Sequence, residues 1–292
     1  MNIDFFAVFV SYKYIYYKGK PFKTVSTMGK LIKMDFYRLF QSKTFWISAA
    51  VMFFLQGITS FSMPILQKNL MRFASVPVDN AGEMLDTKLS EIFSSPMMSF
   101  FMLIMFISAT AFLFADIRDG YVKNFAGQIA RKGYSAISKF IVVCVHNAFF
   151  MLLALSGNIL GVLLCPDSSL IVDSAVTSGI VVFFVKLLLS FAMTSIILFF
   201  TTGLRNKTLA SVVGVLFSVS ALGLLYMALN QLLSMVGIKN FDVSNYAPDQ
   251  LFNSQFDTAA LGAVINAVIV SVVFIAVFVS LTVAIFNKRD VK

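Results

Sequence analysis

Six long apolar stretches restrict this chain to a narrow set of folds. A helix that crosses the hydrocarbon layer of a membrane needs about 20 mostly apolar residues. Charged residues make up 13% of the chain, about half of the fraction usual in soluble domains. We therefore predict an all-α membrane protein with six transmembrane helices. The predicted spans cover residues 45–66, 97–115, 140–164, 175–204, 209–238 and 261–286.

The placement of lysine and arginine predicts the orientation of these spans. Basic residues close to spans are retained on the cytoplasmic side of a membrane. Residues 1–44, 116–139, 205–207 and 287–292 hold 18 of the 23 Lys and Arg residues, so we expect both termini to be cytoplasmic. The net charge of +9 reflects this topology first and attraction to anionic membrane lipid second, and nucleic acid is not an expected partner.

Residues 28–44 have the pattern of an amphipathic helix that leads into the first span. Apolar residues recur at helical spacing, among them Leu31, Phe36 and Leu39, while Lys30 and Lys33 take the opposite face. Such a helix is expected to lie in the cytoplasmic headgroup layer. The spans that follow show no internal repeat, so residues 45–292 are predicted to form one domain.

Residues 1–27 are an N-terminal extension with two open interpretations. They contain an apolar run at 5–10, too short to span a membrane, followed by an aromatic and lysine-rich stretch. The run is consistent with an interfacial anchor. The whole extension is equally consistent with a translated leader upstream of a natural start at Met28.

Residues 116–139 concentrate charge between the second and third spans, with five cations and two carboxylates in 24 residues. Asp116 and Asp119 fall where the N-terminal dipole of a helix favours anions, and Arg131 falls where its C-terminus favours cations. Gly133 would then end that helix. The segment is predicted to form a short helix along the membrane, whose apolar face carries Tyr121, Val122, Phe125 and Ile129.

The sequence shows no pattern for catalysis or metal binding. Cys144 and Cys165 are 21 residues apart in one predicted helix, about 31 Å and too far for a disulfide. His146 is the one histidine in the chain, so neither a catalytic triad nor a zinc site is predicted. The phosphate-binding pattern G-x-x-x-x-G-K-[ST] is absent, so ATP and Mg would have to bind to another polypeptide.

Lys186 is the one formally charged residue inside the predicted spans. A lysine at this depth needs a partner, a cavity or water. It is therefore a candidate for lining a transport path, with Asn230 and Gln231 as further candidates. The alternatives for Lys186 are snorkelling to the interface and pairing with an acid near the outer leaflet. Polar residues within spans more often hydrogen-bond between helices, and this interpretation applies to His146, Asn147, Asn158, Asn230, Gln231 and Asn266.

Two short helices are predicted in the external connections. The first covers residues 80–93, with Met84, Leu85, Leu89 and Ile92 on one side. The second begins at Pro248, because proline suits the first turn of a helix.

The order of these features resembles the permease subunits of type-2 ATP-binding-cassette (ABC) exporters. The resemblance covers residues 28–292 and rests on order and spacing more than on identity. It is carried by the amphipathic helix at 30–46, by Asp119-Gly-Tyr-Val-Lys-Asn124, and by Arg131, Tyr134 and Lys139. In that family an acidic residue and a glycine open a cytoplasmic coupling helix, and basic residues lead into the third span.

The resemblance implies a bacterial exporter of the cytoplasmic membrane, moving amphipathic or hydrophobic peptides or antimicrobials. A second permease subunit, identical or different, would complete the path, and a separate ATPase subunit would supply the energy. The residues implied to dock that ATPase are Asp116, Arg118, Asp119, Gly120, Lys123, Asn124 and Arg131. The alternatives are a transporter or channel that needs no ATPase, and a membrane signalling or assembly protein that transports nothing.

Overall fold

The described part of the chain is almost entirely helical. The computed structural model describes residues 28–73, 86–97, 99–118, 133–166, 168–238, 241–254, 256 and 261–288. Four of the described helices are long and apolar enough to cross a membrane, or five if one bent pair counts as a single span. The four are α3 (Lys43–Phe73), α8 (Gly133–Leu164), α9 (Val176–Leu198) with its π-helical extension η2 (Phe199–Gly203), and α13 (Leu261–Lys288).

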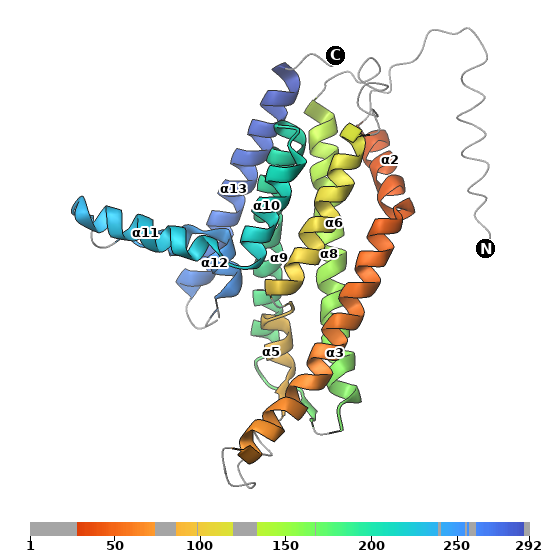
Figure 1. Cartoon of the computed structure of the whole chain (residues 1–292), viewed down its shortest axis with the longest axis vertical. Coiled ribbons are helices and arrows are strands. Elements are labelled where there is room, and N and C mark those ends of the chain that lie inside the picture. Colours follow the sequence, from red (N-terminus) through yellow and green to blue (C-terminus); the bar gives the residue numbers. More distant parts are fainter. Residues whose placement is uncertain are drawn as a thin grey trace, which may run out of the picture.

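The other two predicted spans have a different form. The second corresponds to α6 (Ser99–Arg118), whose apolar part covers Phe101–Ala115 and is shorter than the other four. The fifth is not one straight helix as expected. It consists of α10 (Lys207–Ser218) and α11 (Leu222–Met235), which meet at an angle of 81°. In Figure 1, α11 projects sideways from the bundle.

The bend between α10 and α11 has a local cause, and a hydrogen bond from a residue distant in sequence stabilises it. Ser220 adopts a left-handed backbone conformation with φ 54°, which interrupts the helix. Its hydroxyl accepts a 2.6 Å hydrogen bond from Asn253 Nδ2 of α12 (Pro248–Asn253). The predicted short helix at Pro248 is confirmed, with this proline in its first turn.

The first external connection is only partly helical. Helix α5 covers Leu89–Ser94, and Thr87–Lys88 forms a strand, β1, parallel to β2 at Leu170–Ile171. The predicted helix over 80–93 is therefore wrong at residues 86–88, and residues 80–85 lie outside the described part. Asp173 accepts hydrogen bonds from the hydroxyl and amide of Ser90, at 2.6 and 3.2 Å, and so fixes the start of α5.

Helices α3 and α8 approach each other closely through glycines. A methyl group added at Gly157 would lie 2.9 Å from the carbonyl oxygen of Phe53. One added at Gly161 would lie 2.8 Å from Ser60 Cβ and would also collide with the carbonyl oxygen of Gly57. Two glycines four residues apart are a known means of bringing membrane helices into backbone contact.

Polar side chains join the helices inside the bundle, as expected for three of the predicted positions. His146 of α8 lies 3.1 Å from Ser108 of α6, whose hydroxyl is 3.0 Å from that of Ser48 in α3. Asn147 donates to Thr194 of α9 at 2.5 Å. Asn158 accepts from Gln56 and Ser60 of α3 at 2.7 and 2.6 Å and donates to the Pro96 carbonyl oxygen at 3.0 Å.

Substitution of Gly161 by alanine should weaken the α3–α8 contact. The added methyl group meets backbone atoms that cannot rotate away, so we expect a loss of about 1–3 kcal/mol in stability. Thermal unfolding of the purified protein in detergent measures the effect. Gly262→Ala is the matched control, since a methyl group there has no neighbour within 4 Å. Equal melting temperatures for the two variants would contradict the close approach.

Candidate functional site

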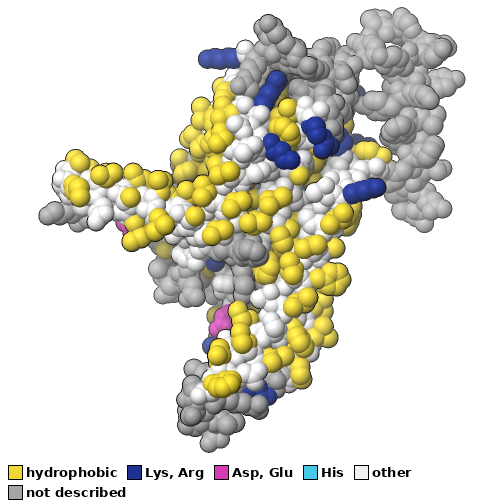
Figure 2. Space-filling model, viewed as in Figure 1, with side chains coloured by type: hydrophobic (Ala, Val, Ile, Leu, Met, Phe, Trp, Pro, Cys, Tyr) yellow, Lys and Arg dark blue, Asp and Glu magenta, His cyan; other side chains and the backbone are white. Residues whose placement is uncertain are grey.

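One end of the bundle collects the described residues of the segments that were predicted to be cytoplasmic. Figure 1 places α2 (Met28–Gln41), the last turn of α6, the first turn of α8 and the last turn of α13 at this end. Figure 2 shows dark blue Lys and Arg side chains grouped toward the same end, with apolar side chains covering much of the remaining surface. We refer to it below as the cation-rich end.

Helix α2 is confirmed, and it is bound to the bundle by a residue that the amphipathic pattern did not single out. Asp35 is buried, with 3% of its surface exposed. Its carboxylate accepts a 2.6 Å hydrogen bond from the Ser138 hydroxyl of α8 and lies 3.7 Å from the Arg38 guanidinium. Leu31 and Leu39 are buried beside it, as the pattern indicated. The helix therefore packs against α8 on one face.

The first residues of α8 are also bound to α13. The Gly133 amide donates to Asn287 Oδ1 at 3.0 Å, and a methyl group at Gly133 would lie 2.8 Å from Val283 Cγ1. Lys139, one and a half turns further along, is 2% exposed, and its Nζ lies 5.9 Å from the centre of the Phe286 ring. The start of α8 is thus held between α2 and α13.

Most of the predicted docking residues lie outside the described part of the chain, namely Asp119, Gly120, Lys123, Asn124 and Arg131. Of the remainder, Arg118 is the exposed last residue of α6, and Asp116 lies in the same last turn. One expected boundary is wrong: Asp116 lies in the last turn of α6, which continues to Arg118, so it does not begin a separate helix. Gly133 is the first described residue of α8, and the helix that it was expected to end lies outside the described residues.

Lys186 is buried in α9, with 4% of its surface exposed. Its Nζ lies 5.5 Å from the centre of the Phe252 ring of α12, within the range of a cation–π contact. Among the described residues, no carboxylate lies within the 4.0 Å limit for an ion pair with Lys186. Asp249, one turn before Phe252 in α12, is 1% exposed, and its carboxylate accepts a 2.9 Å hydrogen bond from the Tyr226 hydroxyl.

Asn230 and Gln231, the other candidates for lining a path, lie on α11. Asn230 donates to Asp242 Oδ1 at 2.6 Å and accepts from the Val243 amide at 2.8 Å, so it organises the start of the short helix η3 (Val243–Tyr246). Gln231 is exposed. The structure places these two residues on a different element from Lys186.

The described residues form an almost entirely helical structure, with four helices, or five if α10 and α11 count as one span, that are long and apolar enough to cross a membrane. No model of a known protein family matches the chain, and the curated proteins contain no match to its sequence.

The contact between Asp35 and Ser138 should contribute measurably to stability. A hydrogen bond to a buried carboxylate is worth about 1.5–3 kcal/mol, and its loss should separate α2 from α8. We expect Asp35→Ala and Ser138→Ala each to lower the melting temperature, and the double variant to lose clearly less than the sum of the two. Lys33→Ala, at an exposed position of the same helix, is the control. Additive losses in the double variant would show that the two side chains do not interact.

Proposed function

We propose that this chain is the membrane-spanning subunit of an ABC exporter, which docks a separate ATPase through the segment between α6 and α8. The main support is the way that the start of α8 is held. Ser138 is bonded to α2 and Gly133 to α13, so the chain re-enters the bundle through a fixed point. A segment that receives force from a partner needs such a fixed connection to pass it on.

In this proposal, ATP and Mg bind to the partner subunit, and nucleotide-driven closure of the partners displaces residues 119–132. The displacement reaches α8 directly and reaches α2 and α13 through Asp35 and Asn287. Helices that move as a packed unit switch between discrete arrangements instead of deforming gradually. The result would be an alternation between inward-open and outward-open forms of a pair of permease subunits.

The proposed substrate class is amphipathic or hydrophobic, such as peptides or antimicrobials. The apolar helix α11 has no buried residue, and large apolar side chains such as Leu224 and Met227 are more than two-thirds exposed. A path formed partly by such surfaces would favour apolar cargo over ions. A bacterial cytoplasmic membrane is the proposed location.

Exchange of the charges at Asp119 and Arg131 tests the docking role. Asp119→Arg with Arg131→Asp leaves the net charge unchanged, so the topology signal is preserved. We expect the amount of ATPase subunit that co-purifies from native membranes, and the ATPase activity stimulated by the complex, to fall by about tenfold or more. Lys88→Glu in the opposite connection is the control. Normal assembly of the exchanged variant would overturn the assignment.

Substitution of Lys186 by methionine tests the path-lining role. Methionine preserves most of the volume and removes the charge, whose insertion costs roughly 2.5–3.5 kcal/mol, so expression should not fall. If Lys186 contacts the substrate, export should decrease at an unchanged protein level. Lys88→Met provides the control for a lysine outside the bundle. Unchanged export would remove Lys186 from the path.

A further inference from the structure

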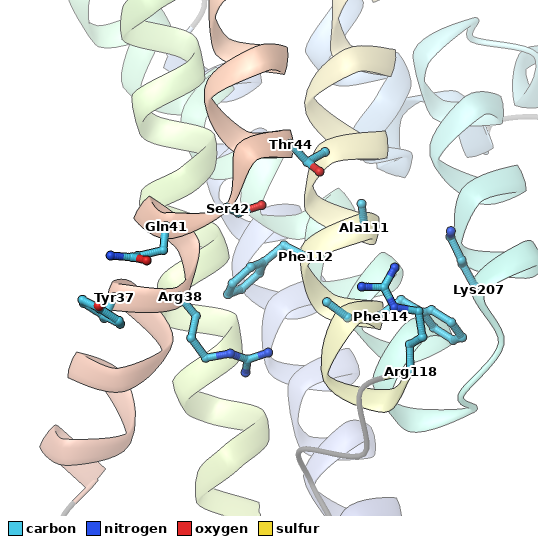
Figure 3. A pocket seen from close by; sticks show the side chains of 11 residues that line it. Tyr37, Arg38, Gln41, Ser42, Thr44, Ala111, Phe112, Phe114, Arg118 and Lys207 are labelled. Carbon is cyan, nitrogen blue, oxygen red and sulfur yellow. The ribbon is translucent and has the colours of Figure 1, made fainter. Parts of the chain in front are cut away.

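A polar cavity lies at the cation-rich end, between α2, the start of α3, the end of α6 and the start of α10. Its volume is about 440 Å³, and three of its lining residues are cations from three different helices: Arg38, Arg118 and Lys207. Figure 3 shows Arg38 approaching from the α2 side and Arg118 and Lys207 from the side of α6 and α10. None of the lining residues among the described part of the chain is acidic.

The other polar groups around the cavity are suited to an anion with several oxygen atoms. Tyr37, Gln41, Ser42 and Thr44 all lie along the junction of α2 and α3 and can each donate a hydrogen bond. Arginine guanidinium groups bind phosphate through two parallel hydrogen bonds. A phosphate group matches both the charge and the donors of this cavity.

Two of the cations are held in place by contacts that leave them directed to the cavity. Lys207 Nζ lies 5.7 Å from the centre of the Phe114 ring, which also lines the cavity. Arg38 lies 3.7 Å from Asp35. A phosphate at this position would place negative charge among three cations that come from three different helices.

The depth of the cavity indicates which kind of phosphate it meets. Trp46 lies one helical turn after Ser42, is 52% exposed and donates its ring N–H to the Phe40 carbonyl oxygen at 2.7 Å. Tryptophan at the end of a span marks the boundary between membrane and water. The apolar candidate span begins at Lys43, so the cavity lies at the level of lipid headgroups. Ala111, Phe112 and Phe114 provide an apolar wall for the adjoining glycerol and acyl carbons.

We propose that this cavity binds the headgroup phosphate of an anionic phospholipid. The bound lipid would join α2, α6 and α10 through one shared anion. This site is independent of the proposed export function, because it needs neither an ATPase nor a cargo.

The test uses the full chain purified in neutral detergent, with phosphatidylglycerol or phosphatidylcholine added. Binding is measured by native mass spectrometry and by the rise in melting temperature. We expect the wild type to bind phosphatidylglycerol selectively, and Arg118→Gln/Lys207→Gln to bind it about tenfold or more weakly. Lys33→Gln/Lys43→Gln is the matched control, because it removes two exposed cations at the same end that do not line the cavity. The single variant Lys207→Gln should show a smaller loss in the same direction if the double variant folds poorly.

Three results would overturn the proposal. Equal binding of the two lipids would show that charge is not recognised. Equal losses in the cavity and control variants would show attraction to the whole basic surface instead of to this site. A third arm replaces lipid with inorganic phosphate. If phosphate alone gave the same stabilisation with the same dependence on Arg118 and Lys207, the ligand would be a free anion and not a lipid.

Discussion

The rest of the described structure depends on the contacts of α8. Inside a membrane, lipid tails are as apolar as the side chains, so helices associate through close packing and hydrogen bonds. Helix α8 uses both: its glycines admit α3, His146 reaches α6 and Asn147 reaches α9. At the cation-rich end its first turns bind α2 through Ser138 and α13 through Gly133. It therefore sets the position of five other helices.

The elements that the sequence predicts well are those determined by local pattern. Apolar length identifies the long helices, helical spacing identifies α2, and Pro248 identifies the start of α12. The break at Ser220 has no such signal, because the apolar run from 209 to 238 is uninterrupted and the partner of Ser220 lies 33 residues away. The burial of Asp35 is similar, since its partner Ser138 is 103 residues distant. Gly157 and Gly161 stand four residues apart, but only the structure shows that Gly57 and Ser60 face them.

In the candidate site, too, local patterns were readable from the sequence and contacts between distant residues were not. Charge density and spacing single out residues 116–139, but they place Asp116 outside the second span, whereas α6 runs to Arg118 and includes it. The hydrogen bond from the Gly133 amide to Asn287 joins residues that are 154 positions apart, so no pattern within the segment contained it. The cavity residues Arg38 and Lys207 lie on helices remote in sequence and had no common motif.

The two ends of the segment 119–132 are held in different ways, and this difference bears on how force would pass through it. At Gly133 the chain enters a helix that is bonded to α2 and α13, so a displacement there would move three helices together. At Arg118 the chain leaves a shorter apolar helix beside a polar cavity, and the last side chain of that helix is exposed. An anionic headgroup bound to Arg118, Arg38 and Lys207 would tie this second end to α2 and α10. In the proposed exporter, the bound lipid would then determine whether α6 moves together with α8 or keeps its position. The coupling between the ATPase subunit and the helix bundle would therefore depend on the lipid composition of the membrane.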